Sequence, residues 1–220
     1  MTSPDYPADY PSPTAGTANL GRSSGFEGMA LSADGRKLYP ALEGAVAGDD
    51  PQVRRVYEFD LRKHEYTGVR RTYRVGTPGE PATNGLSLSD LSALDDHRLV
   101  GLERDNNQGP AAAWKRAFVI ELDRTNGDGT LVKRQVADLL NLRDPARISS
   151  QDARPGDIGL GDPFSYPYLT IEAVLPDGPD RLTIVNDTNF GSTGRNAARP
   201  DDSDFIQVQV PGLRRGEGEG

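Results

Sequence analysis

Short apolar segments alternate with turn residues along most of the chain, and the first of them predict a four-stranded unit. The segment GFEGMALSADGRKLYPALEG predicts a strand over Phe26 to Leu31, a turn at Ala33-Asp34-Gly35 and a second strand over Lys37 to Leu42. RRVYEFDL (Arg54 to Leu61) and GVRRTYRV (Gly68 to Val75) supply two further strands. Prolonged helical periodicity is absent, so the unit is predicted to be an antiparallel sheet.

The order of strand, acidic turn and strand recurs twice. It is found in SDLSALDDHRLVGLERDN (Ser89 to Asn106), followed by strands in RAFVIELD (Arg116 to Asp123) and TLVKRQVADLL (Thr130 to Leu140). The third copy is TIEAVLPDGPDRLTIVNDTNF (Thr170 to Phe190), followed by DFIQVQV (Asp204 to Val210). Four-stranded repeats of roughly 40 to 50 residues are typical of β-propeller blades. We therefore predict an all-β propeller with about three blades, of four, four and three strands.

Three such blades do not close a ring, because propellers contain about four to eight. We expect an N-terminal half outside this sequence, or another chain, to complete the ring. Residues 1–24 contain four prolines and are predicted to be a linker or arm, residues 25–212 the partial propeller domain, and residues 213–220 a disordered tail. Segments 76–85 and 141–168 are rich in Gly, Pro, Asp and Ser and are expected to be loops.

Composition narrows the functional classes. The 25 Gly and 17 Pro fit many short strands and turns. The net charge of −8 argues against nucleic acid as a partner; clustered acids suit metal cations, or simply keep the protein soluble. There is no cysteine, so disulfides and thiolate metal sites do not arise. No apolar run reaches the ~20 residues of a membrane span. The N-terminus of the sequence lacks a signal-peptide pattern, which is compatible with a cytoplasmic location.

Superposing the three units aligns acidic and amide residues at two places, the starts of the first strands and the ends of the second strands. They are Glu27, Asp90 and Glu172, and then Glu43, Glu103, Asn186 and Asp187. First strands lie nearest the channel of a propeller, so these side chains are expected to converge at an acidic mouth. Converging carboxylates favour a hard cation, Ca²⁺ or else Mg²⁺. The alternative is structural: each acid accepts backbone N–H groups or caps a turn in the next unit.

Other polar residues carry weaker signals. Arg104, Lys115 and Arg195 lie next to the acidic strand ends and would contact a phosphate, unless they are solvated surface charges. The segment Asp123 to Gly129 has some calcium-loop spacing but is predicted to be a hairpin turn. Asp201 to Asp204 is either a second cation site or a hydrophilic turn, and the turn is favoured. The two histidines, His64 and His97, are expected to be exposed. No G-x-S-x-G motif occurs, so a serine-esterase triad is disfavoured.

The stretches GFEGMALSADGRKLYPALEG, SDLSALDDHRLVGLERDN and TIEAVLPDGPDRLTIVNDTNFGSTGRNAARPDDSDFIQV resemble the phytase-like family, "esterase-like activity of phytase", of secreted bacterial propeller proteins. The likeness covers about Leu20 to Val210. It implies a propeller fold, a small phosphoester or other ester substrate and, for the family, an extracellular location. Family members usually have a further N-terminal half of similar size.

Two functional hypotheses follow, and a third concerns the chain itself. The first is a metal-dependent phosphoester hydrolase with Glu27, Asp90, Glu172 and Asp187 as ligands. The second is a non-catalytic propeller module that binds a ligand or a protein through its acidic mouth, which the lack of an obvious general base or nucleophile favours. The third is a truncated product with little stability of its own.

Overall fold

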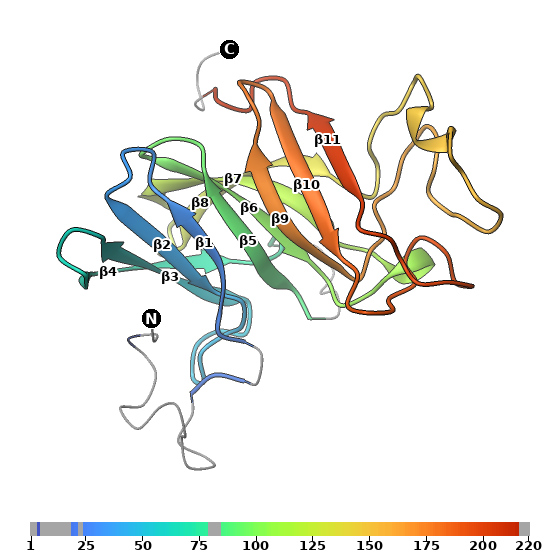
Figure 1. Ribbon diagram of the computed structural model, residues 1–220. Coiled ribbons are helices and arrows are strands. Elements are labelled where there is room, and N and C mark those ends of the chain that lie inside the picture. Colours follow the sequence, from blue (N-terminus) through green and yellow to red (C-terminus); the bar gives the residue numbers. More distant parts are fainter. Residues whose placement is uncertain (1–3, 5–18, 22–23, 79–84, 216–220) are drawn as a thin grey trace.

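The computed structural model describes residues 4, 19–21, 24–78 and 85–215. Within these ranges the protein is all-β: eleven strands form three antiparallel sheets of four, four and three strands, and the helical residues are confined to two short 3₁₀ turns, η1 (Gly109–Ala111) and η2 (Ile148–Ser150). Each sheet is built from strands consecutive in sequence (Figure 1). The predicted division into four, four and three strands is confirmed.

The first sheet contains β1 (Phe26–Leu31), β2 (Lys37–Leu42), β3 (Val53–Asp60) and β4 (Glu65–Arg74), in that order. β1 and β2 have the predicted bounds. β4 begins three residues before the predicted Gly68, because His64 adopts a left-handed φ of 57° and closes a tight turn after β3. Pairing therefore starts at Asp60 and Glu65.

The second sheet contains β5 (Ser87–Ala93), β6 (Arg98–Arg104), β7 (Lys115–Thr125) and β8 (Leu131–Asp138). The connection between β7 and β8 is a hairpin turn, as predicted. The N–H of Asn126 donates to the carbonyl of Thr130 (2.8 Å), and Asp128 Oδ1 accepts the Thr130 N–H at 3.0 Å. Asp128 therefore stabilises the turn through local hydrogen bonds.

The third sheet contains β9 (Thr170–Pro176), β10 (Arg181–Asp187) and β11 (Phe205–Gln209). β10 lies between the other two, so β11 is an edge strand among the described residues. Phe205 is largely exposed on that edge. An edge strand leaves backbone donors and acceptors unpaired by the sheet.

The first strands of the three sheets, β1, β5 and β9, lie side by side (Figure 1). Ser89 and Ser92 on β5 donate hydroxyl hydrogen bonds of 2.7 Å to the carbonyls of Ile171 and Val174 on β9. On the other side, a Cβ added to Gly28 of β1 would lie 2.8 Å from the backbone N of Leu91. Glycine is required at that position because any side chain would separate β1 from β5.

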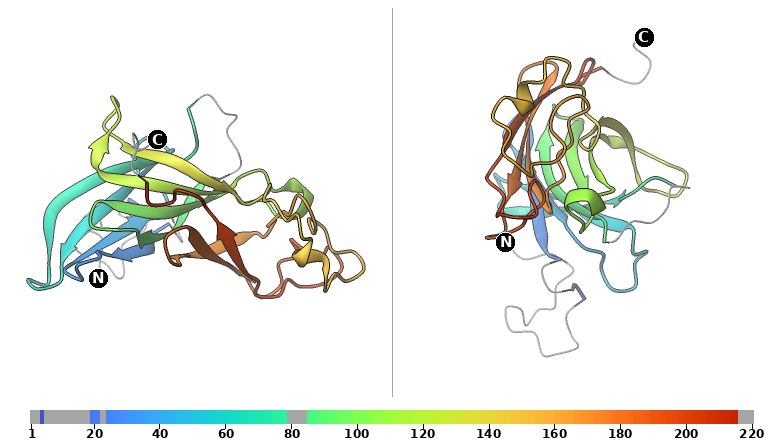
Figure 2. Two further views of the ribbon diagram at one scale, coloured as in Figure 1. Left: turned by 90° about the horizontal axis from the view of Figure 1, so that it is seen from above. Right: turned by 90° about the vertical axis from the view of Figure 1, so that its right-hand side faces the viewer.

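Apolar side chains of neighbouring sheets form two main clusters. One lies between the first and second sheets and includes Tyr73, Leu91 and Phe118, and the other lies between the second and third sheets and includes Leu102 and Ile184. The long segment 139–169 extends beyond the third sheet (Figure 2). It remains attached because its aromatic residues belong to the second cluster: Phe164, Tyr166 and Tyr168.

The predicted arm and tail fall mostly outside the described residues. Of residues 1–24, only 4, 19–21 and 24 are described, and Leu20 is buried and bridged to Val46. Of residues 213–220, the last five are not described, and Leu213 is buried in the cluster between the second and third sheets.

Candidate functional site

A cavity of about 820 Å³ opens at the end of the molecule where β1, β5 and β9 begin. All three sheets contribute to it, and we call it the mouth cavity. Its charged and amide side chains are Glu27, Glu43, Arg54, Arg104, Asn106, Glu172, Asp187 and Asn189. Five of the residues singled out from the sequence are therefore brought together here: Glu27, Glu43, Arg104, Glu172 and Asp187.

Arg104, the last residue of β6, joins the three sheets at the mouth cavity. Its guanidinium donates to Glu43 Oε1 through Nη2 (2.9 Å), to Glu172 Oε1 through Nε (3.2 Å) and to Asn106 Oδ1 through Nη1 (2.7 Å). Glu43 follows β2, and Glu172 lies on β9. The predicted convergence of carboxylates is thus built around an arginine side chain, which supplies a fixed positive charge with planar, forked donors.

The carboxylates around Arg104 perturb one another. Burial raises the pKa of Glu172 to about 7; Arg104 opposes this shift, and the charges of Glu27 and Glu43 add to it. Burial also raises the pKa of Glu27, with Glu43 and Asp90 acting in the same direction and Arg104 against it. Glu172 Oε2 is buried without a hydrogen-bond partner. A carboxyl group that changes protonation near neutral pH can give or take a proton in a reaction.

Glu172 also makes stability depend on pH. A folded pKa of about 7, above the model value of 4.5, means that the folded state binds this proton more tightly than the unfolded state. Its contribution is complete below pH 4.5 and is lost as pH rises through 7. We expect the free energy of unfolding, measured with urea, to fall by about 2–3 kcal/mol more for the wild type than for Glu172→Gln between pH 4.5 and 8.

A matched control for this measurement is Glu65→Gln, which alters an exposed carboxylate at the start of β4. This variant should keep the fall in stability between pH 4.5 and 8, because Glu172 is intact in it. Parallel curves for the wild type and Glu172→Gln would show that Glu172 does not titrate in this range.

The rim beside Asp187 has a strained backbone. Asn189 and Phe190 adopt left-handed φ values of 45° and 54°, a conformation uncommon for residues other than glycine. The Asn189 N–H donates to Asp187 Oδ1 (2.9 Å), and Asn189 Nδ2 donates to Thr170 Oγ1 (2.7 Å). Phe190 is fully exposed next to the cavity. An aromatic ring held outward beside a polar cavity can contact a ligand.

Asp90 accepts a backbone N–H from a neighbouring unit, which is the structural alternative to metal ligation expected from the sequence. Its Oδ2 accepts the backbone N–H of Val174 on β9 at 2.8 Å, so it links the second sheet to the third. Burial raises its pKa, and backbone hydrogen bonds from Val174 and Leu91 oppose the shift. Asp90 does not line the mouth cavity.

Glu103 and Asn186 point away from the mouth cavity into the protein. Glu103 is fully buried, where its carboxylate accepts hydrogen bonds from Tyr73 Oη (2.5 Å), Gly76 N (2.9 Å) and Trp114 Nε1 (2.9 Å) and pairs with Lys133. Asn186 Oδ1 accepts the N–H of Asp204 at 2.6 Å, and its Nδ2 donates to the carbonyl of Asp202 at 3.1 Å. Both residues hold parts of the fold together.

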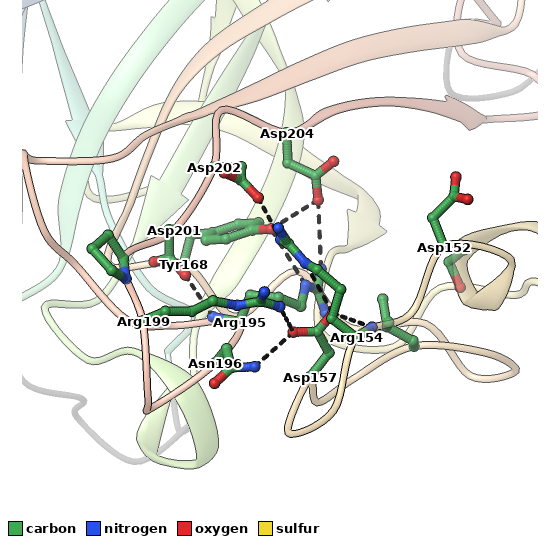
Figure 3. A pocket seen from close by; sticks show the side chains of 13 residues that line it. Asp152, Arg154, Asp157, Tyr168, Arg195, Asn196, Arg199, Asp201, Asp202 and Asp204 are labelled. Carbon is green, nitrogen blue, oxygen red and sulfur yellow. Dashed lines mark hydrogen bonds and ion pairs between the residues drawn. The ribbon is translucent and has the colours of Figure 1, made fainter.

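Lys115 and Arg195 do not join Arg104 in the mouth cavity. Lys115 is completely buried, with Nζ 3.0 Å from Asp105 Oδ1 and within hydrogen-bond distance of the carbonyls of Asp105 and Leu169. Burial lowers its pKa to about 8, although Asp105 opposes this. Arg195 lines a separate pocket among the loops of the third sheet (Figure 3).

Three of the charged and amide side chains in the cavity were not candidate site residues in the sequence: Arg54, Asn106 and Asn189. Arg54 is buried, and its Nη1 and Nη2 donate to backbone carbonyls, including that of Leu86 at 2.5 Å. It belongs to β3, and its approach to the cavity depends on how the sheets pack. Asn106 and Asn189 each lie two residues after the end of a second strand, β6 or β10, and this position was the available signal.

Within the described ranges, no three His, Asp or Glu side chains group in a way that could hold a metal ion. The histidines lie outside the cavity: both are exposed, as expected, and His97 Nδ1 lies 2.5 Å from Asp123 Oδ2. This pairing raises the pKa of His97. In the part of the chain that the structure describes, no helix is both long and apolar enough to span a bilayer.

Two comparisons with known proteins bear on this site. The family model "Phytase-like: Esterase-like activity of phytase" matches residues 3–190. A protein of Arthroderma benhamiae (strain ATCC MYA-4681 / CBS 112371) named "Uncharacterized secreted protein" is 31% identical over 134 residues. That match covers 54% of this chain and 26% of the relative, so the chain spans about a quarter of the length of the curated relative it matches.

Proposed function

The chain belongs to the phytase-like family, "esterase-like activity of phytase", and from this membership we propose that it forms part of a hydrolase acting on ester bonds, with the mouth cavity as its site. The observation that carries the proposal is the contact of Arg104 with Glu43 and Glu172 inside one cavity shared by three sheets. A small phosphoester or other ester is the substrate class. The three sheets are proposed to be blades of a β-propeller.

Three charged groups and one amide of the cavity have proposed roles. The Arg104 guanidinium would stabilise negative charge that develops on an ester oxygen, because fixed donors in a site shielded from water act strongly on such charge. Glu172, whose carboxyl titrates near neutral pH, would transfer a proton to or from water or the leaving group. Asp187 and Asn189 lie at the rim, where they would orient the substrate.

A Ca²⁺ or Mg²⁺ ion, the finer form of this proposal, would polarise an ester oxygen and activate water when bound. In the arrangement observed here, the carboxylates do not fit such an ion. Glu43 Oε1 and Glu172 Oε1 accept hydrogen bonds from Arg104, and among the described carboxylates of the cavity only Glu172 Oε2 is buried without a partner. Metal ligation through Glu43 Oε1 and Glu172 Oε1 would therefore require Arg104 to release them, and the activity assay with Ca²⁺ and with a chelator tests for a metal.

We expect the full chain to hydrolyse 4-nitrophenyl phosphate or 4-nitrophenyl acetate, with kcat reduced at least about 100-fold by Glu172→Gln because a proton-transfer group is lost. Asp187→Asn should mainly raise KM. The assays are run with Ca²⁺ and with a chelator. Glu65→Gln, in an exposed part of β4, is the control and should retain full activity.

Activity that survives both Glu172→Gln and Asp187→Asn would reject the mouth cavity as the site. Activity that persists in the chelator but depends on Glu172 would support the arginine-centred form of the proposal. Activity that requires Ca²⁺ would support the metal-dependent form.

The second candidate is a non-catalytic module that binds a ligand through the mouth cavity. The observation that favours it is that the described cavity side chains include no hydroxyl paired with a histidine. This candidate predicts that 4-nitrophenyl phosphate raises the melting temperature of the wild type without being turned over. Loss of that shift in Glu172→Gln would place the binding in the cavity.

Secretion is proposed for this chain because its relative is named a secreted protein. We also propose that further residues of a longer protein, or another chain, complete the ring. Two observations support this: β11 is an edge strand among the described residues, and the apolar side chains of Met29, Leu31 and Leu175 are exposed on β1 and β9. Light scattering of the full chain, which measures its mass in solution, tests completion by another chain. A monomer with cooperative unfolding would argue against completion by another chain.

A further inference from the structure

A second pocket, of about 370 Å³, lies between the loop around η2 and the loop that precedes β11 (Figure 3). It shares no lining residue with the mouth cavity. Its size falls in the range of small-molecule sites. Its charged side chains are Asp152, Arg154, Asp157, Arg195, Arg199, Asp201, Asp202 and Asp204.

Arg195 forms a rigid wall of this pocket. The residue is only 6% exposed, and its Nη1 donates to the carbonyls of Ile158 (2.5 Å) and Ser165 (2.9 Å). Its Nε donates to Tyr168 Oη at 3.3 Å, and its guanidinium lies over the rings of Phe164 and Tyr168. The remaining nitrogen, Nη2, is buried and has no hydrogen-bond partner.

Arg199 supplies a second unused donor. Its Nη2 donates to Asp157 Oδ1 at 2.7 Å, whereas its Nε is buried without a partner. Nη2 of Arg195 is 3.7 Å from Asp204 Oδ2, which is too long for a hydrogen bond. Two guanidinium groups in one pocket therefore each hold a donor that the protein does not satisfy, and such donors are costly when buried.

The innermost carboxylates of the pocket do not compete for these donors, because other groups already hold them. Although burial opposes the shift, hydrogen bonds from Asn196 Nδ2, the Arg154 N–H and Arg199 lower the pKa of Asp157 to about 2. Asp201 accepts the N–H groups of Gly194 (2.7 Å) and Arg195 (2.8 Å).

Three other carboxylates line the pocket. Asp204 Oδ2 accepts a hydrogen bond from Tyr168 Oη at 2.8 Å and forms a longer ion pair with Arg195 Nη2. Asp202 is well exposed, and its carboxylate pairs with Arg154. The labelled side chain of Asp152 stands apart from the cluster in Figure 3. The pocket thus has two unsatisfied cationic donors in its wall, carboxylates beside them that are already hydrogen-bonded, and exposed carboxylates at its rim.

We propose that this pocket binds a small ligand through one carboxylate or phosphate group, which accepts hydrogen bonds from Arg195 Nη2 and Arg199 Nε. Oxyanions are the acceptors that guanidinium donors match best. The rest of the ligand lies against the acidic rim, so it carries hydrogen-bond donors such as hydroxyl groups. The site takes an anion independently of any reaction in the mouth cavity.

The test is calorimetric titration of the full chain at low ionic strength with two probes, inorganic phosphate and gluconate, a hydroxylated carboxylate. Saturable binding of at least one probe is expected, and the stronger probe identifies the anion. Arg199→Gln should raise Kd about tenfold, because one charge-assisted hydrogen bond is lost. Arg143→Gln is the matched control: Arg143 is an exposed arginine on the segment 139–169, paired with Asp162, and does not line the pocket.

Arg195→Lys keeps the charge but cannot reproduce the fork of donors, and it should also weaken binding. If that variant fails to fold, Arg199→Gln decides the question, since Arg199 is only half-buried. No saturable binding of either probe to the wild type would overturn the proposal. Binding that is unchanged in Arg199→Gln, or that is lost in Arg104→Met instead, would place the anion elsewhere and would also overturn it.

Discussion

Replacing Glu103 with glutamine is expected to lower the free energy of unfolding by about 3–5 kcal/mol, because it leaves a buried cation without its partner. The Glu103 carboxylate is completely buried. It accepts hydrogen bonds from Tyr73, Gly76 and Trp114 and forms an ion pair with Lys133. Burial lowers the pKa of Lys133, and Glu103 opposes this shift. The Glu103→Gln side chain keeps the shape of glutamate. Its amide nitrogen is itself a donor, however, and would face groups that donate to the carboxylate.

Urea unfolding of Glu103→Gln, Lys133→Met and the double variant measures this interaction. The double variant should be less destabilised than the sum of the two single variants, because the second change removes the unpaired charge. Glu65→Gln, which changes an exposed glutamate, is the control and should stay within about 0.5 kcal/mol of the wild type. A loss of less than 1 kcal/mol for Glu103→Gln would show that the network contributes little.

The strand order was predictable because it depends on local patterns. Alternating apolar residues bounded by turn residues located each strand to within a few residues, and sequential hairpins fixed the order within each sheet. The side-by-side position of β1, β5 and β9 follows from the repeat, and with it the approach of Glu27 to Glu172. Closure of the ring stays a prediction, since it concerns residues outside the three sheets.

Which aligned side chain enters the mouth cavity was not predictable from the repeat. The hairpins β1–β2, β5–β6 and β9–β10 each contain a register irregularity near the cavity end. A shift of one residue sends a side chain to the opposite face of a strand. These irregularities lie on the first strands, whereas on the second strands adjacent side chains simply alternate between the two faces: Arg104 and Asp187 line the cavity, and their neighbours Glu103 and Asn186 point into the protein.

Burial also separates the three cations singled out from the sequence. Lys115 and Arg195 were named with Arg104 as phosphate contacts, with solvated surface charges as the alternative, but neither lines the mouth cavity. Lys115 is instead sealed between Asp105 and a backbone carbonyl, and Arg195 is stacked on aromatic rings of the long loop. These contacts join residues far apart in the chain, so no local pattern records them.

Replacing Arg104 with methionine is expected to destabilise the protein by about 3 kcal/mol at pH 8, because Glu43 and Glu172 lose the cation between them. The loss should shrink as pH falls below 7, where Glu172 becomes protonated and its repulsion with Glu27 and Glu43 weakens. Urea unfolding at pH 8 and pH 5 measures both effects. Arg143→Met, on an exposed arginine outside the cavity, is the control.

The same variant separates an arginine-centred mouth from a metal-centred one. In Arg104→Met the carboxylates of Glu43 and Glu172 are released, and such converging oxygens favour a hard cation. Ca²⁺ should therefore raise the melting temperature of Arg104→Met and leave that of the wild type nearly unchanged, with no gain in the double variant Arg104→Met/Glu172→Gln. Equal stabilisation of the wild type would mean that the cation binds without displacing Arg104, and the wild-type cavity would then be a metal site as it stands.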